Sequence, residues 1–379
     1  MARRRHRRSA SHLVSGMVVV GLLVGAGAVA ASAVLARRDI GASPRPSTVA
    51  GTTKPVSALQ SSARSERPLA LVQAGDSRTA CISGGPGPGL RQVESATRLT
   101  YNCIETFTNK VRTWAEWADP WITSSTSAPF VAWVAADPTG HQLIDTQDLI
   151  PASETTNPRW VAECAAGDYN TYATQFAKNM IAAGFGYSII RLGAEMNGTW
   201  EGDSLGDNKT KWQQWGKCFA QEVKAMRAVP RAHFLLDWNI NARYRDIPLA
   251  DYYPGNAYVD IVGISLYDES GSRLPHVGSP GRWRILVSEP MGMNEVYAFA
   301  AKHHKPLSFP EWGTLIKQGD DGNYVANMGA FIASHDVAYQ SWFNAGNGNV
   351  YQLNPTEAPN SVAAYIRTIS RRVARSAAK

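Results

Sequence analysis

The stretch YSIIRLGAE, residues 187–195, joins a short apolar run to a glutamate, and the chain continues with MNGTW. A helical pattern precedes it in YNTYATQFAKNMIAAG, residues 169–184, where apolar side chains recur at every fourth position. A second helical pattern, TKWQQWGKCFAQEVKAM, follows in residues 210–226. A strand between two helices is the repeating unit of an α/β protein, so this stretch predicts that fold class.

The same alternation extends along the chain in both directions. Seven further runs of strand length are predicted, in residues 79–85, 99–107, 129–137, 232–241, 258–268, 306–314 and 337–345. Most of these runs are nearly continuously apolar, which is typical of parallel strands that are buried on both faces. Eight strands alternating with helices over about 290 residues fit a single (β/α)8 TIM barrel.

An open, doubly wound parallel sheet is the alternative fold. Nucleotide-binding sheets of that kind carry GxGxxG after the first strand. Here the corresponding segment is GGPGPG, residues 84–89, whose prolines lack the backbone N–H groups that a phosphate loop needs. The barrel is therefore the favoured interpretation.

The net charge of +7 is concentrated at the N-terminus. Seven of the 38 basic residues are arginines within residues 1–38, where no acidic residue occurs, and the 31 that remain equal the 31 acidic residues. Because the rest of the chain is formally neutral, it lacks the basic surface that nucleic-acid binding requires. We expect no nucleic-acid partner.

An uncharged apolar segment of 24 residues, 13–36, follows the basic cluster RRRHRR. It is long enough to cross a hydrocarbon core, and the arginines before it should stay cytoplasmic. The small-residue patterns AVA (28–30) and ASA (31–33) also fit a signal-peptide cleavage site. We expect an extracellular protein, either anchored to the membrane by residues 13–36 or secreted after cleavage.

Four domains follow from these patterns. Residues 1–38 form a basic tip with the anchor or signal peptide, and residues 39–77 form a linker rich in serine, threonine and proline. The barrel occupies residues 78–370 and a basic tail residues 371–379. We expect the barrel to be monomeric.

In a barrel of this kind, the active site lies at the C-terminal ends of the strands. The residues predicted to gather there are carboxylates, an amide and aromatic rings: Glu195, Asn197, Trp238, Tyr267, Glu311, Trp312 and Trp342. No HxH pair and no cysteine occurs among the strand ends, and no CxxC spacing occurs in the chain, so no metal and no cofactor is predicted.

Two carboxyl groups with aromatic rings suit the hydrolysis of glycosidic bonds. One carboxylic acid protonates the leaving oxygen, and the other carboxylate meets the developing positive charge or attacks directly. Glu195 follows an apolar strand, and apolar surroundings favour its protonated form. We therefore assign Glu195 as the acid/base and Glu311 as the nucleophile, with aromatic faces stacking on sugar rings.

The segment RLGAEMNGTW, residues 191–200, resembles the R-x-x-x-E-M-N-G-x-W segment of glycoside hydrolase family 26. KPLSFPEWGT, residues 305–314, looks like the nucleophile segment of that family, and VDIVGISLYD, residues 259–268, is similar to its sixth strand. The two glutamate segments are specific, whereas the likeness over residues 78–370 is otherwise loose.

The resemblance implies a retaining, endo-acting hydrolase of β-linked polysaccharide, most often β-1,4-mannan. It also implies that Tyr267 hydrogen-bonds the nucleophile, that Trp342 lies under the sugar being cut, and that Trp200 stacks on a neighbouring sugar. The chain departs from the family at Ala194, where many of its mannanases have histidine. Another β-glucan or a β-xylan therefore stays an alternative substrate, and a non-catalytic carbohydrate-binding or cell-envelope barrel stays an alternative function.

The four cysteines make an even number, and disulfides are expected outside the membrane. Cys81 and Cys103 lie in neighbouring predicted strands. Cys164 precedes the helix before residues 187–195, and Cys218 lies in the helix after them. We predict that Cys81 pairs with Cys103 and Cys164 with Cys218.

Overall fold

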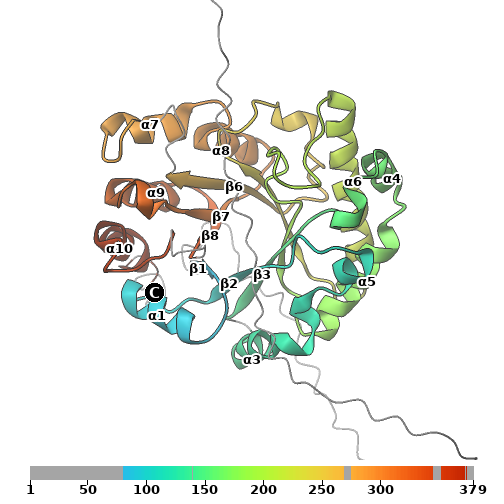
Figure 1. Cartoon of the computed structure of the whole chain (residues 1–379), viewed down its shortest axis with the longest axis horizontal. Helices are drawn as coiled ribbons and strands as arrows, with labels where there is room; N and C mark the ends of the chain where they lie inside the picture. Colours follow the sequence, from blue (N-terminus) through green and yellow to red (C-terminus); the bar gives the residue numbers. More distant parts are fainter. Residues whose placement is uncertain (1–79, 139, 269–274, 345–350, 372, 374–379) are drawn as a thin grey trace, which may run out of the picture. The chain divides into compact units, whose positions relative to one another are not determined.

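A closed parallel barrel forms the centre of the fold in the computed structural model, which describes residues 80–138, 140–268, 275–344, 351–371 and 373. Its eight strands neighbour one another in chain order, and the first pairs with the last (Figure 1). The predicted barrel is therefore confirmed. The strands are β1 Ala80–Ser83, β2 Cys103–Phe107, β3 Gln142–Gln147, β4 Ile189–Leu192, β5 Leu235–Asn241, β6 Ile261–Asp268, β7 Leu307–Thr314 and β8 Val337–Trp342.

Helices surround the strands, as Figure 1 shows. They are α1 Pro88–Thr97, α2 Trp114–Ala118, α3 Ala128–Ala136, α4 Trp160–Ala166, α5 Asn170–Ala182, α6 Lys209–Arg227, α7 Pro280–Ser288, α8 Met293–Lys302, α9 Gly322–Ser334 and α10 Pro359–Tyr365. A π-helical turn, Ile366–Ser370, extends α10. Short 3-10 turns occur at Trp121–Thr123, Ser125–Ser127, Ala152–Glu154, Leu249–Asp251 and Ile316–Gln318.

Two apolar clusters hold the barrel together. The larger cluster lies between strands and helices, where alternate strand residues such as Leu236 and Ile264 contact the helical layer. The smaller cluster comprises Cys81, Cys103, Ile144, Ile189, Ile261, Ala338 and Tyr339. Most of its members come from the first halves of their strands, so they fill the N-terminal end of the barrel interior.

The prediction of the third strand was wrong. The apolar run PFVAWVAAD, residues 129–137, lies almost entirely in helix α3, and the strand is the polar segment QLIDTQ, Gln142–Gln147. Proline at the helix start favours the helical form. All six strand residues are buried, and their polar side chains are hydrogen-bonded inside the protein, which the apolar pattern could not reveal.

Both predicted disulfides are present. Cys81 and Cys103 are register partners on β1 and β2, with their Cα atoms 4.3 Å apart. Cys164 on α4 is joined to Cys218 on α6 across 4.8 Å between Cα atoms. The first disulfide therefore ties two strands together and the second ties two helices of the outer layer.

The N-terminal segments expected from the sequence, residues 1–38 and 39–77, lie outside the described residues, as does most of the tail. Within the described part, no helix combines the length and apolarity needed to cross a membrane.

Candidate active site

Glu195 reaches the C-terminal end of the barrel through a left-handed turn after β4. Gly193 and Glu195 have φ angles of 58° and 55°, and glutamate adopts such an angle rarely. At Gly193 a Cβ atom would lie 2.7 Å from the ring of Trp215, so a side chain is excluded there. The Glu195 N–H donates to the carbonyl of Asn239 at 2.9 Å, which holds the turn against β5.

The Glu195 carboxylate is bound by two neutral donors. Its Oε1 accepts from Asn241 Nδ2 at 3.1 Å, and its Oε2 accepts from the indole Nε1 of Trp200 at 3.0 Å. Burial and then the negative charge of Glu311 raise the pKa of Glu195 to about 7. The group can therefore hold a proton near neutral pH, as an acid/base requires.

Glu311 lies in β7 at a bulge, where the strand locally carries one residue more than the paired segments of β6 and β8. Phe309 and Trp312 pair with Gln340 and Trp342, so three steps along β7 match two along β8. A similar shift separates β7 from β6 between Ser308 and Trp312. The surplus residue allows both Ser308 and Glu311 to face the barrel interior.

Two strong donors bind the Glu311 carboxylate. The Arg191 guanidinium forms an ion pair with Oε1, and the Tyr267 hydroxyl donates to Oε2 at 2.6 Å. The contact of Tyr267 is the one that the family resemblance implied. The Glu311 side chain is 14% exposed, so its carboxylate lies close to the surface of the barrel end. These donors stabilise negative charge on Glu311.

Arg191 organises the interior beneath Glu311. It is fully buried on β4, and its Nε and Nη2 donate to Asn239 Oδ1 at 2.9 and 2.6 Å. Its Nη1 also forms an ion pair with Glu105 on β2 at 3.3 Å. Burial raises the pKa of Glu105 to about 8 despite the opposing effect of Arg191. Arg191 was not predicted to have a role, although a charge inside an apolar strand is a usable signal of a buried ion pair.

Three tryptophans predicted to bind substrate point away from the barrel interior. Trp238, Trp312 and Trp342 are each fully buried and belong to the cluster between strands and helices. Trp312 lies 4.8 Å from Trp342 between ring centroids, and both rings contact Tyr365 of α10. Because strand side chains alternate, these residues point outward while their neighbours point inward. The substrate-binding assignments of these three residues are corrected to core packing.

Asn197 also has a different role from the one predicted. Its Nδ2 donates to the carbonyls of Asn241 and Tyr244, and its Oδ1 accepts from the Asn241 N–H at 2.8 Å. The side chain is fully buried, so it positions the segment that carries Asn241 and cannot contact a sugar in this arrangement. Trp200, in contrast, is half-buried and packs edge-on against Tyr244 at 4.7 Å.

An aromatic row that the sequence did not reveal begins beside Glu311. Phe343 lies 5.9 Å from Tyr267 between ring centroids and 5.8 Å from Phe107. Tyr351 packs against both Tyr267 and Phe343, at 5.1 and 5.5 Å. Phe343 directly follows Trp342, so the ring near the predicted position comes from the next residue along the chain.

A second acidic group lies after β3 and β4. Glu201 forms an ion pair with Lys110 at 3.4 Å. Burial and the charge of Asp148 raise the pKa of Glu201 to about 7, and burial raises the pKa of Asp203 to about 7. The charge of Glu311 also raises the pKa of Glu201, so Glu201 borders the site. The pKa of Glu201 is therefore close to that of Glu195.

The segment GDSLG, residues 202–206, has the G-x-S-x-G spacing of a serine nucleophile. Its Ser204 follows no strand, and its hydroxyl bonds the carbonyl of Glu201. No hydrogen bond to a histidine is found for Ser204 in the described part of the chain, so the spacing has no catalytic setting.

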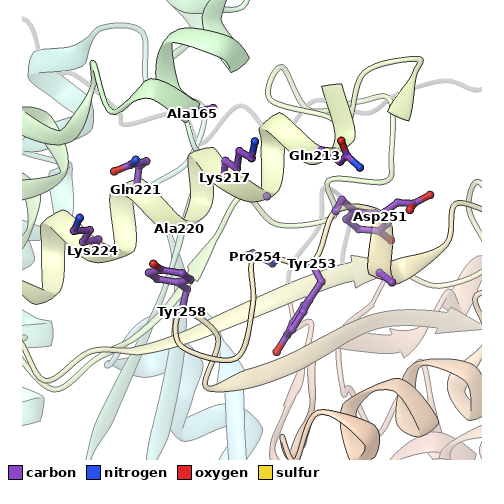
Figure 2. Close-up of a pocket in the computed structure, with 13 residues that line it drawn as sticks. Ala165, Gln213, Lys217, Ala220, Gln221, Lys224, Asp251, Tyr253, Pro254 and Tyr258 are labelled. Atoms are coloured by element: carbon purple, nitrogen blue, oxygen red, sulfur yellow. The ribbon is translucent and has the colours of Figure 1, made fainter. Parts of the chain in front are cut away.

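A separate groove of about 630 Å³ lies on the outer wall, between α6 and residues 250–258. Figure 2 shows Lys217, Gln221 and Lys224 projecting from α6, with Tyr258 on the opposite segment. None of the residues that line this groove belongs to the candidate site. The groove is therefore distinct from the place where the carboxylates meet.

Part of the chain matches a known protein family. Residues 174–278 match the model of glycosyl hydrolase family 26, and this segment contains Glu195 and Tyr267. No curated protein sequence matches the chain.

Among solved structures, the fold is similar to a GH26 β-mannanase from Bacteroides ovatus, with a TM-score of 0.57 and 14% identity over 76% of this chain and 87% of that one. An endo-β-1,4-mannanase double mutant from Cellulomonas fimi gives a TM-score of 0.57 and 16% identity over 79% and 73%. GH26C from a Muricauda species gives 0.56 and 13% over 80% and 87%. The family model thus matches the part of the chain that carries Glu195 and Tyr267, and the solved structures share the barrel fold.

Proposed function

We propose that the protein is a retaining, endo-acting glycosidase that cleaves β-linked polysaccharide, with β-1,4-mannan as the first candidate substrate. One observation carries the proposal. Glu195 and Glu311 lie at the same end of the barrel, close enough for the charge of one to raise the pKa of the other, yet they have different partners. Neutral N–H donors bind Glu195, whereas a guanidinium binds Glu311.

In the first step, a Glu311 carboxylate oxygen attacks the anomeric carbon of the bound sugar. The bond from that carbon to the glycosidic oxygen breaks, and Glu195 gives its proton to the departing oxygen. Arg191 and Tyr267 hold the Glu311 carboxylate in one orientation, which lowers the cost of positioning it for attack.

In the second step, Glu195 acts as a base. It accepts a proton from water, the water oxygen attacks the anomeric carbon, and the bond to Glu311 breaks. The product keeps the original anomeric configuration because two inversions occur. Glu195 starts this step ionised, and its hydrogen bonds from Asn241 and Trp200 stabilise that form.

Trp200 has two functions in this proposal. Its indole N–H orients Glu195, and its half-buried ring offers a face to a sugar next to the scissile bond. Ala194, beside Glu195, supplies no side-chain hydrogen bond. Mannan is proposed because β-mannanases are among the structures with a similar barrel, and the missing donor at Ala194 keeps other β-glucans and β-xylan in the test.

The test is a substrate panel. The purified protein is incubated with mannan, lichenan, xylan and cellulose, and new reducing ends are measured. We expect release from mannan above the others, and NMR of the first product should show the β-anomer. An α-anomer would reject retention, and no release from any polymer would favour a carbohydrate-binding barrel.

We also propose that residues 1–77 place the barrel outside the cell, anchored or after cleavage. Two disulfides support an oxidising compartment. Protease added to intact cells, and immunoblotting of the medium, would test this. A barrel that is protected from protease and absent from the medium would contradict it.

A further inference from the structure

Trp121 is an exposed indole held at the catalytic end of the barrel. Its ring is 41% exposed, and its Nε1 donates to the carbonyl of Phe107 at 3.1 Å. Phe107 is the last residue of β2, so this hydrogen bond attaches the ring to the strand end. With its N–H satisfied, the indole presents an apolar face to solvent in a fixed position.

A second aromatic residue supports Trp121 from the side. Phe130 on α3 packs edge-on against it, with 5.6 Å between ring centroids. Phe130 lies in turn on Gly85, just after β1, where a Cβ atom would come within 3.0 Å of the ring. Trp121 is thus held by the end of β2 and by Phe130, which itself lies against the segment after β1.

The same strand end connects Trp121 to Glu311. Phe107, whose carbonyl holds Trp121, packs 5.8 Å from Phe343, which packs 5.9 Å from Tyr267. Tyr267 donates its hydroxyl to Glu311 at 2.6 Å. The row of rings therefore runs from Tyr267, beside Glu311, through Phe343 to Phe107, and the Phe107 carbonyl connects its end to the exposed indole.

Single exposed apolar residues are common and usually need no explanation. Tyr172 is such a residue here, because it is 36% exposed and stacks only on Trp114 at 4.5 Å. Trp121 differs in three respects: its fixed N–H, its support by Phe130, and its place at the end of a row that starts at Glu311.

We propose that Trp121 forms a distal binding platform for a β-linked oligosaccharide whose cleaved sugar lies at Glu311. This inference rests on the proposed function for the identity of its ligand. Tyr267, Phe343 and Phe107 lie in sequence between Glu311 and the strand end that holds Trp121, so the indole would contact a sugar beyond the one being cleaved. Trp121 therefore selects for long chains.

The experiment measures chain-length dependence of binding. Affinities for mannobiose and mannohexaose are determined by calorimetry in a Glu311→Ala background, which prevents turnover. Adding Trp121→Ala should reduce the preference for mannohexaose over mannobiose about tenfold, because an apolar ring face is lost. Trp121→Phe should restore part of the preference. Tyr172→Ala is the matched control and should leave the preference unchanged.

An unchanged preference in Trp121→Ala would overturn the inference, as would a parent protein that binds neither oligosaccharide. The ratio of kcat/KM for the two substrates, measured with Glu311 present, gives an independent reading. If the Trp121 effect on binding is found but no variant hydrolyses mannan, the platform stands and the proposed hydrolysis fails. If hydrolysis is found without a Trp121 effect, only the platform fails.

Discussion

The two ends of the barrel interior are built from opposite kinds of residue. The N-terminal end is closed by apolar side chains and the Cys81–Cys103 disulfide. The C-terminal end holds Arg191 with its partners Glu105 and Glu311, all from strands of the same barrel. The same eight strands thus form an apolar core at the N-terminal end of the barrel and a charged network at the C-terminal end.

This difference indicates that the N-terminal end stabilises the fold, whereas the C-terminal end holds the groups proposed for the reaction. Apolar burial and a covalent cross-link stabilise the fold without directing any reaction. A buried arginine with two glutamates contributes little net stability, because desolvation opposes the Coulomb attraction. Its value lies in holding Glu311 in place. A change at the apolar end should therefore affect stability alone, whereas a change in the charged network should also affect activity.

The largest effect is expected from Glu311→Ala at the charged end. Loss of the nucleophile should lower kcat by about ten-thousandfold, on the scale seen when a covalent nucleophile is removed. Activity on the best polymer of the panel is the measurement. Glu163→Ala, which removes an ion pair with Arg159 at the outer helix α4, is the control and should keep full activity. Retained activity in Glu311→Ala would reject the assignment.

Arg191→Met, at the charged end, should lower both the stability of the fold and the activity. It leaves Glu105 and Glu311 without their buried cation, so we expect a loss of about 3–5 kcal/mol in the free energy of unfolding. Urea unfolding measures this loss. A second change, Glu105→Gln, should recover part of the stability but not the activity. A stable and active Arg191→Met variant would show that the network is dispensable.

Removing the disulfide of the apolar end should affect stability alone. The pair Cys81→Ala and Cys103→Ala opens a connection of 22 residues in sequence separation, which corresponds to about 3 kcal/mol in the loop-entropy model. Thermal unfolding should show a lower Tm, while kcat at low temperature stays that of the parent. A large drop in kcat of the folded variant would contradict the division between the two ends.

The smallest effect is expected in the pH dependence of kcat/KM, which Glu195 at the charged end should control. Glu195 has its pKa raised to about 7, so the protonated acid is present below that pH and is lost above it. We expect kcat/KM to fall about tenfold per pH unit above 7. Glu201→Gln tests the neighbouring group with a similar pKa and should leave the alkaline fall in place. If the fall disappears in Glu201→Gln, Glu201 and not Glu195 controls it.

Seven strands and both glutamates could be predicted because their signals are local. An apolar run marks a strand buried on both faces, and a carboxylate at its end marks the catalytic side of a barrel. The polar strand Gln142–Gln147 was missed because its side chains serve the interior network, where Thr146 contacts Glu105 and Arg191. Local rules fail most readily where residues are chosen for function.

The directions of the tryptophans could not be predicted in the same way. Trp312 and Glu311 are adjacent, and only the alternation of the strand decides which of them faces inward. The bulge in β7 changes that alternation, and Pro310 inside a central strand is its one local signal in the sequence. The proposed platform at Trp121 depends on a hydrogen bond to the end of β2. The order of residues in the sequence does not reveal this bond either.

The surplus residue of β7 makes the direction of the Glu311 side chain sensitive to a deletion in this strand. Without it, odd and even positions beyond Phe309 would exchange sides, so the carboxylate of Glu311 would enter the helical layer and the indole of Trp312 would enter the axis. Deletion of Pro310 would thus remove the Glu311 carboxylate from the barrel interior, although Glu195 and Glu311 are both still encoded. The number of residues in β7 therefore matters to the site as well as their identity.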